Sequence, residues 1–194
     1  MTVIPVLPAA GIGVARDTIS GRFSLQAARH GDRAAMVGQG QRVTYRELDE
    51  VSNTLARQLI RCGVRPGDVV PVCLPRSVSL VVCLLAVLKA GAAYSVLPPD
   101  WPLARRLEIV WQSGAALLVA PSEDGWRTPV FRPPAWEDTT GSPELPEAPR
   151  ITGEAAAALF FTSGSTGPPR PWCRRTGGRS GCWTIPCSPR SRRE

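Results

Sequence analysis

Residues 69–97, VVPVCLPRSVSLVVCLLAVLKAGAAYSVL, place an apolar helical pattern between two apolar runs. The first run, residues 69–74, predicts a strand that is covered on both faces. Ser77 can cap a helix that continues to a stop at Gly91, and residues 92–97 return to a strand. Two buried strands joined by one helix favour parallel pairing through a right-handed crossover.

The same alternation continues toward the C-terminus. A helix is predicted over residues 103–112, with four side chains facing inward: Leu103, Leu107, Val110 and Trp111. Residues 115–120 predict a buried strand, residues 129–132 a short strand within a proline-rich connection, and residues 155–161 the last strand. Strands and helices that alternate with short connections predict an α/β fold with a mostly parallel sheet flanked by helices.

The N-terminal part adds a helix and a hairpin to this plan. A helical pattern covers residues 23–33, and residues 34–37 and 41–44 predict two short strands around a glycine-containing turn. Thr44 and Glu47 then have the spacing of a capping box at the start of a long amphipathic helix.

The last predicted strand leads directly into TSGSTGPPR, residues 162–170. Glycines allow successive backbone N–H groups to turn toward a bulky anion, and hydroxyl groups add donors that rotate to suit each oxygen. The predicted phosphate-binding residues are Thr162, Ser163, Gly164, Ser165, Thr166, Gly167 and Arg170. A plain linker is the alternative interpretation, and neither a Walker A motif nor a Gly-x-Gly-x-x-Gly motif following a predicted strand is present.

Three stretches in sequence order resemble core motifs of the adenylate-forming superfamily, the AMP-dependent synthetases and ligases. Residues 161–170 resemble its signature phosphate loop, residues 43–48 its first core motif, and residues 88–94 continuing to residues 99–102 its second. Ser165 and the run into Asp-Trp-Pro are most similar to the adenylation domains of nonribosomal peptide synthetases. The resemblance implies the N-terminal part of such a domain.

By this resemblance, the full-length relative uses ATP and Mg²⁺ to activate an amino acid or other carboxylic acid. The acyl group then passes to the phosphopantetheine thiol of a carrier protein. The loop would hold the β- and γ-phosphates of ATP and favour the charge that develops on pyrophosphate. The other two motifs are interpreted as structural, and no catalytic residue is predicted. In one departure from the family, Pro171 replaces a flexible glycine and removes an N–H donor.

Residues 171–194 differ from the rest in composition. They contain six arginines and one acidic residue, Glu194, so most of the net charge of +7 belongs to them. No periodicity is visible, which predicts a disordered basic tail. A frameshift near codon 171 is the preferred explanation. The alternatives are a genuine disordered end and a tail that contacts the phosphates of nucleic acid, a partner that is not favoured because no folded reader accompanies the tail.

The predicted organisation is an irregular leader over residues 1–22, a partial adenylation domain over residues 23–170, and the tail. Relatives continue for several hundred residues that supply an acyl pocket and a catalytic lysine, so the chain is expected to be truncated and inactive alone. A non-catalytic nucleotide-binding or assembly-docking pseudo-domain is the alternative.

Targeting and metal signals are weak. The leader lacks a basic segment and its apolar run is interrupted by prolines, while the longest apolar run, residues 78–88, is too short for a bilayer. Six singly spaced cysteines and one histidine do not suggest a zinc site. A soluble, cytoplasmic protein without a membrane partner is expected.

Overall fold

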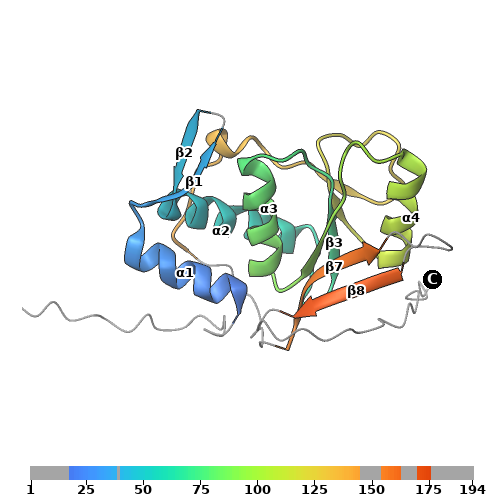
Figure 1. Ribbon diagram of the computed structural model, residues 1–194, viewed down its shortest axis with the longest axis horizontal. Helices are drawn as coiled ribbons and strands as arrows, with labels where there is room; N and C mark the ends of the chain where they lie inside the picture. The colour runs from blue at the N-terminus through green and yellow to red at the C-terminus, as the bar shows by residue number, and fades with distance from the viewer. Residues whose placement is uncertain (1–17, 39, 145–153, 163–169, 176–194) are drawn as a thin grey trace, which may run out of the picture.

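A six-stranded sheet with the order β6-β5-β3-β4-β7-β8 runs through the computed structural model, which describes residues 18–38, 40–144, 154–162 and 170–175 (Figure 1). Its strands are β3 (Val69–Val72), β4 (Ala93–Val96), β5 (Leu118–Val119), β6 (Val130–Phe131), β7 (Ala156–Thr162) and β8 (Arg170–Arg175). All neighbours pair in parallel except β7 and β8, which are antiparallel. The predicted α/β fold with a mostly parallel sheet is confirmed.

Helices cover both faces of this sheet. In Figure 1, α1 (Ile19–His30), α2 (Tyr45–Arg61) and α3 (Val78–Lys89) lie on one side of the strands, and α4 (Leu103–Ser113) lies on the other. Alternate side chains of one strand point to opposite faces. Accordingly, Val119 belongs to the apolar cluster under α2 and α3, whereas its neighbour Leu118 belongs to the cluster under α4.

Two smaller elements lie outside the sheet. The strands β1 (Ala34–Gly38) and β2 (Gln41–Thr44) form the predicted antiparallel hairpin, and the 3₁₀ helix η1 (Trp136–Asp138) lies between β6 and β7 in the chain. Gly40, in the hairpin turn, has a φ of 75°, a conformation that glycine adopts without strain.

The helix starts follow the predicted caps. The Glu47 N–H donates to Thr44 Oγ1 at 3.2 Å, and the Thr44 N–H donates to Glu47 Oε2 at 2.7 Å, which completes the capping box of α2. These hydrogen bonds, first the one from the Thr44 backbone and then that from its hydroxyl, lower the pKa of Glu47. At α3, the Leu80 N–H donates to Ser77 Oγ at 3.3 Å. Local sequence therefore sets where both helices begin.

Several predicted boundaries were wrong. Helix α1 begins at Ile19 instead of residue 23, because the Thr18 hydroxyl accepts the Gly21 N–H at 3.1 Å and caps the helix earlier, within the predicted leader. Strand β5 is two residues long instead of six, since its ladder with β3 joins only Val72 and Val119.

The predicted inward face of α4 was partly wrong. Trp111 is 80% exposed and Leu103 is 41% exposed, whereas Ile109, which was not predicted to face inward, is fully buried. The helix is therefore rotated about its axis relative to the prediction. Helix α4 carries more apolar side chains than the sheet can cover. The periodicity of its apolar residues therefore did not identify which of them are buried.

The prediction of disorder was wrong for residues 171–175, which belong to β8. This strand pairs with β7 from Thr162↔Arg170 to Ala156↔Arg175. The edge of β7 offers backbone donors and acceptors to a neighbouring strand. Residues 170–175 can therefore pair with it without a hydrophobic pattern of their own. Residues 176–194 lie outside the described residues, as do most of the predicted leader and the phosphate-loop residues 163–169.

None of the helices in the described ranges has both the length and the apolar character of a membrane span.

Candidate functional site

The predicted phosphate loop joins two adjacent strands. Thr162 is the last residue of β7, Arg170 is the first of β8, and the two are direct cross-strand partners. The structure therefore brings the first and last predicted site residues together. Those between them, Ser163, Gly164, Ser165, Thr166 and Gly167, lie outside the described residues.

The strand that enters this loop ends at the carboxyl edge of the parallel sheet. β7 pairs in parallel with β4 through Tyr94↔Ala158, and β4 pairs in parallel with β3. The helices that follow β3 and β4, α3 and α4, cover opposite faces of the sheet (Figure 1). In open α/β sheets, ligands bind outside the carboxyl ends of the strands where successive connections diverge in this way. The loop thus begins beside a position that suits ligand binding.

Two stacked arginines lie near the same edge, and sequence reasoning missed them. The Arg105 guanidinium lies 4.4 Å from the centre of the Trp101 ring, and the Arg106 guanidinium lies 5.4 Å from that of Trp126. Arg106 Nη1 also donates to Cys73 Sγ at 3.5 Å. The Trp-Pro dipeptide followed by paired arginines was a usable signal. The contact of Arg106 with Trp126 had no such sequence signal, because Trp126 comes from a different segment of the chain.

The hydrogen bonding of these two arginines is incomplete. In the part of the chain that the structure describes, the Nε atoms of Arg105 and Arg106 are buried and have no hydrogen-bond partner. Buried polar atoms are usually paired, and an exception calls for a physical explanation. The arrangement can supply hydrogen-bond donors and positive charge, which are the requirements of an anion site.

A second polar cluster is structural. Lys89 Nζ is buried and donates to Asp49 Oδ1 at 2.8 Å, Ser52 Oγ at 2.7 Å and Asn53 Oδ1 at 2.7 Å. Burial lowers the pKa of Lys89 to about 8, against the opposing attraction of Asp49. Ser24 Oγ of α1 donates to the same carboxylate at 2.9 Å. The network joins three helices, which agrees with the structural interpretation of the second motif.

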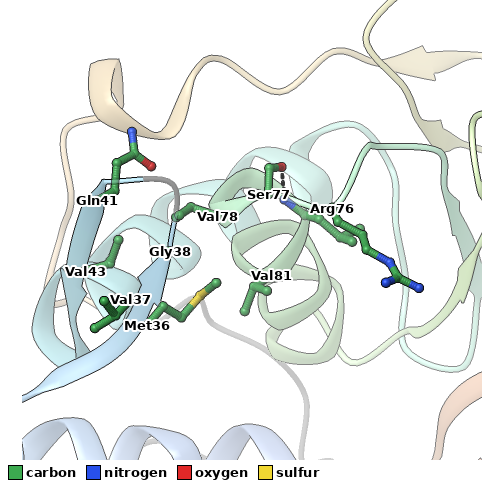
Figure 2. A pocket seen from close by; sticks show the side chains of 10 residues that line it. Met36, Val37, Gly38, Gln41, Val43, Arg76, Ser77, Val78 and Val81 are labelled. Atoms are coloured by element: carbon green, nitrogen blue, oxygen red, sulfur yellow. Dashed lines mark hydrogen bonds between the residues drawn. The ribbon is translucent and has the colours of Figure 1, made fainter.

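A groove of about 350 Å³ lies between the β1–β2 hairpin and the start of α3 (Figure 2). Its walls are mainly apolar, with Met36 and Val37 on one side and Val78 and Val81 on the other, and Arg76 is its charged lining residue. Its lining residues in the described ranges include no acid–base pair, and the Ser77 hydroxyl among them accepts from the Leu80 N–H as the cap of α3.

The described ranges contain no group of three His, Cys, Asp or Glu side chains placed to hold a metal ion.

Comparison with known proteins gives a family match over most of the chain. The family model described as "AMP-binding enzyme" matches residues 23–172. The chain is 38% identical over 156 residues to nonribosomal peptide synthetase 8 of Aspergillus fumigatus, a match that covers 76% of this chain and 2% of that protein. For eight of the curated relatives that it matches, the chain spans between 2% and 15% of their length.

Solved structures show the same similarity. The N-terminal subdomain of NpsA from Klebsiella oxytoca, in complex with 3-hydroxyanthranilyl-AMSN, superposes with a TM-score of 0.71 at 26% identity. That match covers 82% of this chain and 40% of the solved chain. An artificially fused adenylation–PCP di-domain, NpsA-ThdA, from the same organism also matches, with a TM-score of 0.71 at 25% identity, covering 82% of this chain and 32% of the other.

Proposed function

The chain belongs to the AMP-binding enzyme family, and on this premise we propose that residues 162–170 bind the polyphosphate of ATP during formation of an acyl adenylate. The full-length protein activates an amino acid or another carboxylic acid in this reaction. The 194-residue chain supplies the phosphate-binding part of the site.

The position of the loop is the observation that carries this proposal. The two described ends, Thr162 and Arg170, are cross-strand partners at the carboxyl edge of a parallel sheet. Between them the sequence holds only small hydroxyl residues, glycines and prolines. A connection of this composition at this edge can present several N–H and O–H donors to one phosphate group.

The chemistry of the loop is electrostatic. Backbone N–H groups and the hydroxyls of Ser163, Ser165 and Thr166 would donate to phosphate oxygens, and Arg170 would add positive charge. Donors that are already placed where negative charge develops lower the barrier to release of pyrophosphate. ATP supplies the phosphoryl groups and the AMP that is transferred. Mg²⁺ would be held through phosphate oxygens, since it usually keeps several waters and takes few protein ligands.

The acid and the acceptor are proposed from the relatives. NpsA was solved with an acyl-AMSN ligand and, in NpsA-ThdA, fused to a PCP domain. We infer that the full-length protein hands its acyl group to the phosphopantetheine thiol of such a carrier protein. Because this chain covers 40% of the solved NpsA subdomain, we expect no acyl-adenylate formation by the 194-residue chain alone.

The test is ATP binding by calorimetry with the purified 194-residue chain. The double variant Ser165→Ala/Thr166→Ala removes two loop hydroxyls, and Thr139→Ala removes a hydroxyl next to η1 as the control. Hydrogen bonds to charged groups contribute about 1.5–3 kcal/mol each, so we expect at least roughly a tenfold rise in Kd for the loop variant. Equal Kd values for the loop variant and the wild-type chain would contradict phosphate binding by the loop.

ATP–pyrophosphate exchange tests the second part of the proposal. The 194-residue chain is expected to bind ATP without supporting exchange. Robust exchange would show that it is active alone. ATP binding without exchange by the longest natural form of the protein would favour a non-catalytic nucleotide-binding role instead.

A further inference from the structure

The stacked arginines of α4 have no assigned role in the loop's function. We propose that Arg105 and Arg106 form a second phosphate-contacting site at the carboxyl edge of the sheet, which binds the polyphosphate that the loop also contacts. This inference rests on the proposed function. The second site itself consists only of described residues.

The position of the arginines follows from the connection between β4 and α4. Because β4 ends at the carboxyl edge, the helix that follows starts there, and both arginines lie in its first turn. Arg106 Nη1 lies 3.5 Å from the sulfur of Cys73, the first residue after β3. β4 alone separates β3 from β7 in the sheet. With strands about 4.8 Å apart, the carboxyl ends of β3 and β7 lie roughly 10 Å apart across the sheet.

The indole rings hold the guanidinium groups in place. A planar guanidinium stacks well on an aromatic face, and the contact restricts its motion without using its N–H donors. The rings of Trp101 and Trp126 therefore orient Arg105 and Arg106, and the donors stay available. The thiol of Cys73 is a weak acceptor and satisfies little of the hydrogen-bonding capacity of Arg106.

The charge of both arginines lacks a carboxylate partner. Among the described residues, Arg46 pairs with Asp32 and Arg132 pairs with Glu123, but no ion pair includes Arg105 or Arg106. Their buried Nε atoms also have no partner there. Two neighbouring cations without an ion-pair partner among the described side chains fit a ligand that brings several negative oxygens.

The strand that delivers the loop is packed onto the same structure. Phe161, next to the last residue of β7, packs against the apolar cluster under α4. Trp101 and Trp126 pack against this cluster as well, which contains Cys73 and Leu97. The base of the loop and the two arginine–indole pairs therefore share one apolar support. A polyphosphate placed between them would be contacted from both sides.

The experiment measures binding of ATP, inorganic tripolyphosphate and adenosine to the 194-residue chain. The variants are Arg105→Gln, Arg106→Gln and Arg106→Lys. Arg127→Gln is the matched control, because Arg127 follows Trp126, is exposed, and loses the same charge. A unit charge about 10 Å from a phosphate at an effective dielectric constant near 20 predicts roughly a tenfold loss of affinity. We expect this loss for ATP and tripolyphosphate with each Gln variant and no change for adenosine.

Two controls separate this role from general effects. Arg106→Lys keeps the charge but loses the stacked planar group, so it should recover part of the affinity, which a loss of charge alone would not explain. Arg127→Gln should change tripolyphosphate binding by less than about twofold, because salt and water screen an exposed charge. If the thermal transition shows that Arg106→Gln does not fold, the affinities of Arg105→Gln and Arg106→Lys are compared instead. A larger loss of affinity with Arg105→Gln than with Arg106→Lys then supports the second site.

The outcomes distinguish this inference from the proposed function. If the loop double variant loses tripolyphosphate binding and both Gln variants keep it, the second site is refuted and the proposed function remains. An equal loss with Arg127→Gln also refutes the second site, because diffuse charge then explains the effect. If the wild-type chain binds neither ATP nor tripolyphosphate, both ideas fail. If the Gln variants lose tripolyphosphate binding and the loop variant keeps it, the arginine site is supported and phosphate binding by the loop is contradicted.

Discussion

The face of the sheet under α2 and α3 is closed by a buried polar network, whereas the face under α4 leaves aromatic and cationic side chains partly open. On the first face, Lys89 is 1% exposed and its ammonium group has four hydrogen-bond acceptors. On the second, Trp111 is 80% exposed, and Arg105 and Arg106 have buried Nε atoms without partners in the described structure. The first face satisfies its buried charge within the protein, and the second is where we place the proposed phosphate contacts.

This difference between the faces depends on whether the charged groups on each face have hydrogen-bond partners within the protein. A buried charge is tolerated only when its hydrogen bonds are satisfied, because burial removes it from water. Lys89 meets this condition within the protein. The α4 arginines are only partly buried, stack on indoles and form no ion pair with a described carboxylate. Three predictions test the contrast, from the largest expected effect to the smallest.

The largest effect is expected from Lys89→Met. Removing one partner of a buried ion pair costs about 3–5 kcal/mol, because the other charge stays buried and unpaired. The free energy of unfolding from urea titration, followed by circular dichroism, measures this loss. Asp49→Asn should also be destabilising, because it leaves the buried ammonium without a counter-charge even though the amide oxygen can still accept from Nζ. A stability of Lys89→Met equal to that of the wild-type chain would remove the proposed difference between the faces.

The next effect is a pH dependence that belongs to the same side chain. Burial lowers the pKa of Lys89 from 10.5 to about 8, so between these values the unfolded chain holds a proton that the folded chain has released. Stability contributed by this group therefore rises with pH across this window, and below pH 8 the cost of burying the charge is present in full. The depression corresponds to roughly 3 kcal/mol, at 1.36 kcal/mol per pKa unit.

Urea titrations of the wild-type chain and of Lys89→Met at pH 7.5 and pH 10 measure this rise as a change in the difference between them. The Cys83 thiol, whose pKa is raised to about 12 by burial, affects both proteins in the same way and cancels. If the difference in the free energy of unfolding between the two proteins is independent of pH, burial does not lower the pKa of Lys89.

The smallest effect compares the first turns of two helices. α2 begins with a complete capping box, whereas the N-cap residue of α4, Pro102, provides no side-chain cap. Thr44→Ala is expected to cost about 1 kcal/mol in the free energy of unfolding, since it removes the acceptor for the Glu47 N–H. Glu47→Gln keeps the reciprocal hydrogen bond and should cost only a few tenths of a kcal/mol. A larger cost for Glu47→Gln than for Thr44→Ala would mean that charge, not capping geometry, stabilises the start of α2.

Much of the fold was predictable because its signals are local. Thr44, Glu47 and Ser77 cap the helices that they were expected to cap, and the turn at Gly40 closes the expected hairpin. The signal failed where packing overrode periodicity. α4 turns Ile109 to the sheet and Trp111 to solvent, because only one side of the helix meets the strands. The strand over residues 170–175 was missed since its pairing depends on the backbone edge of β7.

The candidate site divides in the same way. The composition of residues 162–170 predicted phosphate binding, because glycine backbone freedom and hydroxyl donors are properties of the residues themselves. The arginine–indole pairs were missed since one of them requires residues from different segments. Arg106 and Trp126 meet only after the chain has crossed the sheet.

The amino-acid sequence alone determined the order of strands and helices along the chain and the caps that start α2 and α3, because each depends on neighbours within a few residues, and it supplied the prediction for the loop. Only the tertiary structure decided which side chains satisfy one another. Arg106 and Cys73 are 33 residues apart in the chain, and Lys89 and Asp49 are 40 apart. These pairs form because the sheet and its covering helices place distant segments side by side, and hydrophobic burial of the two faces holds them there.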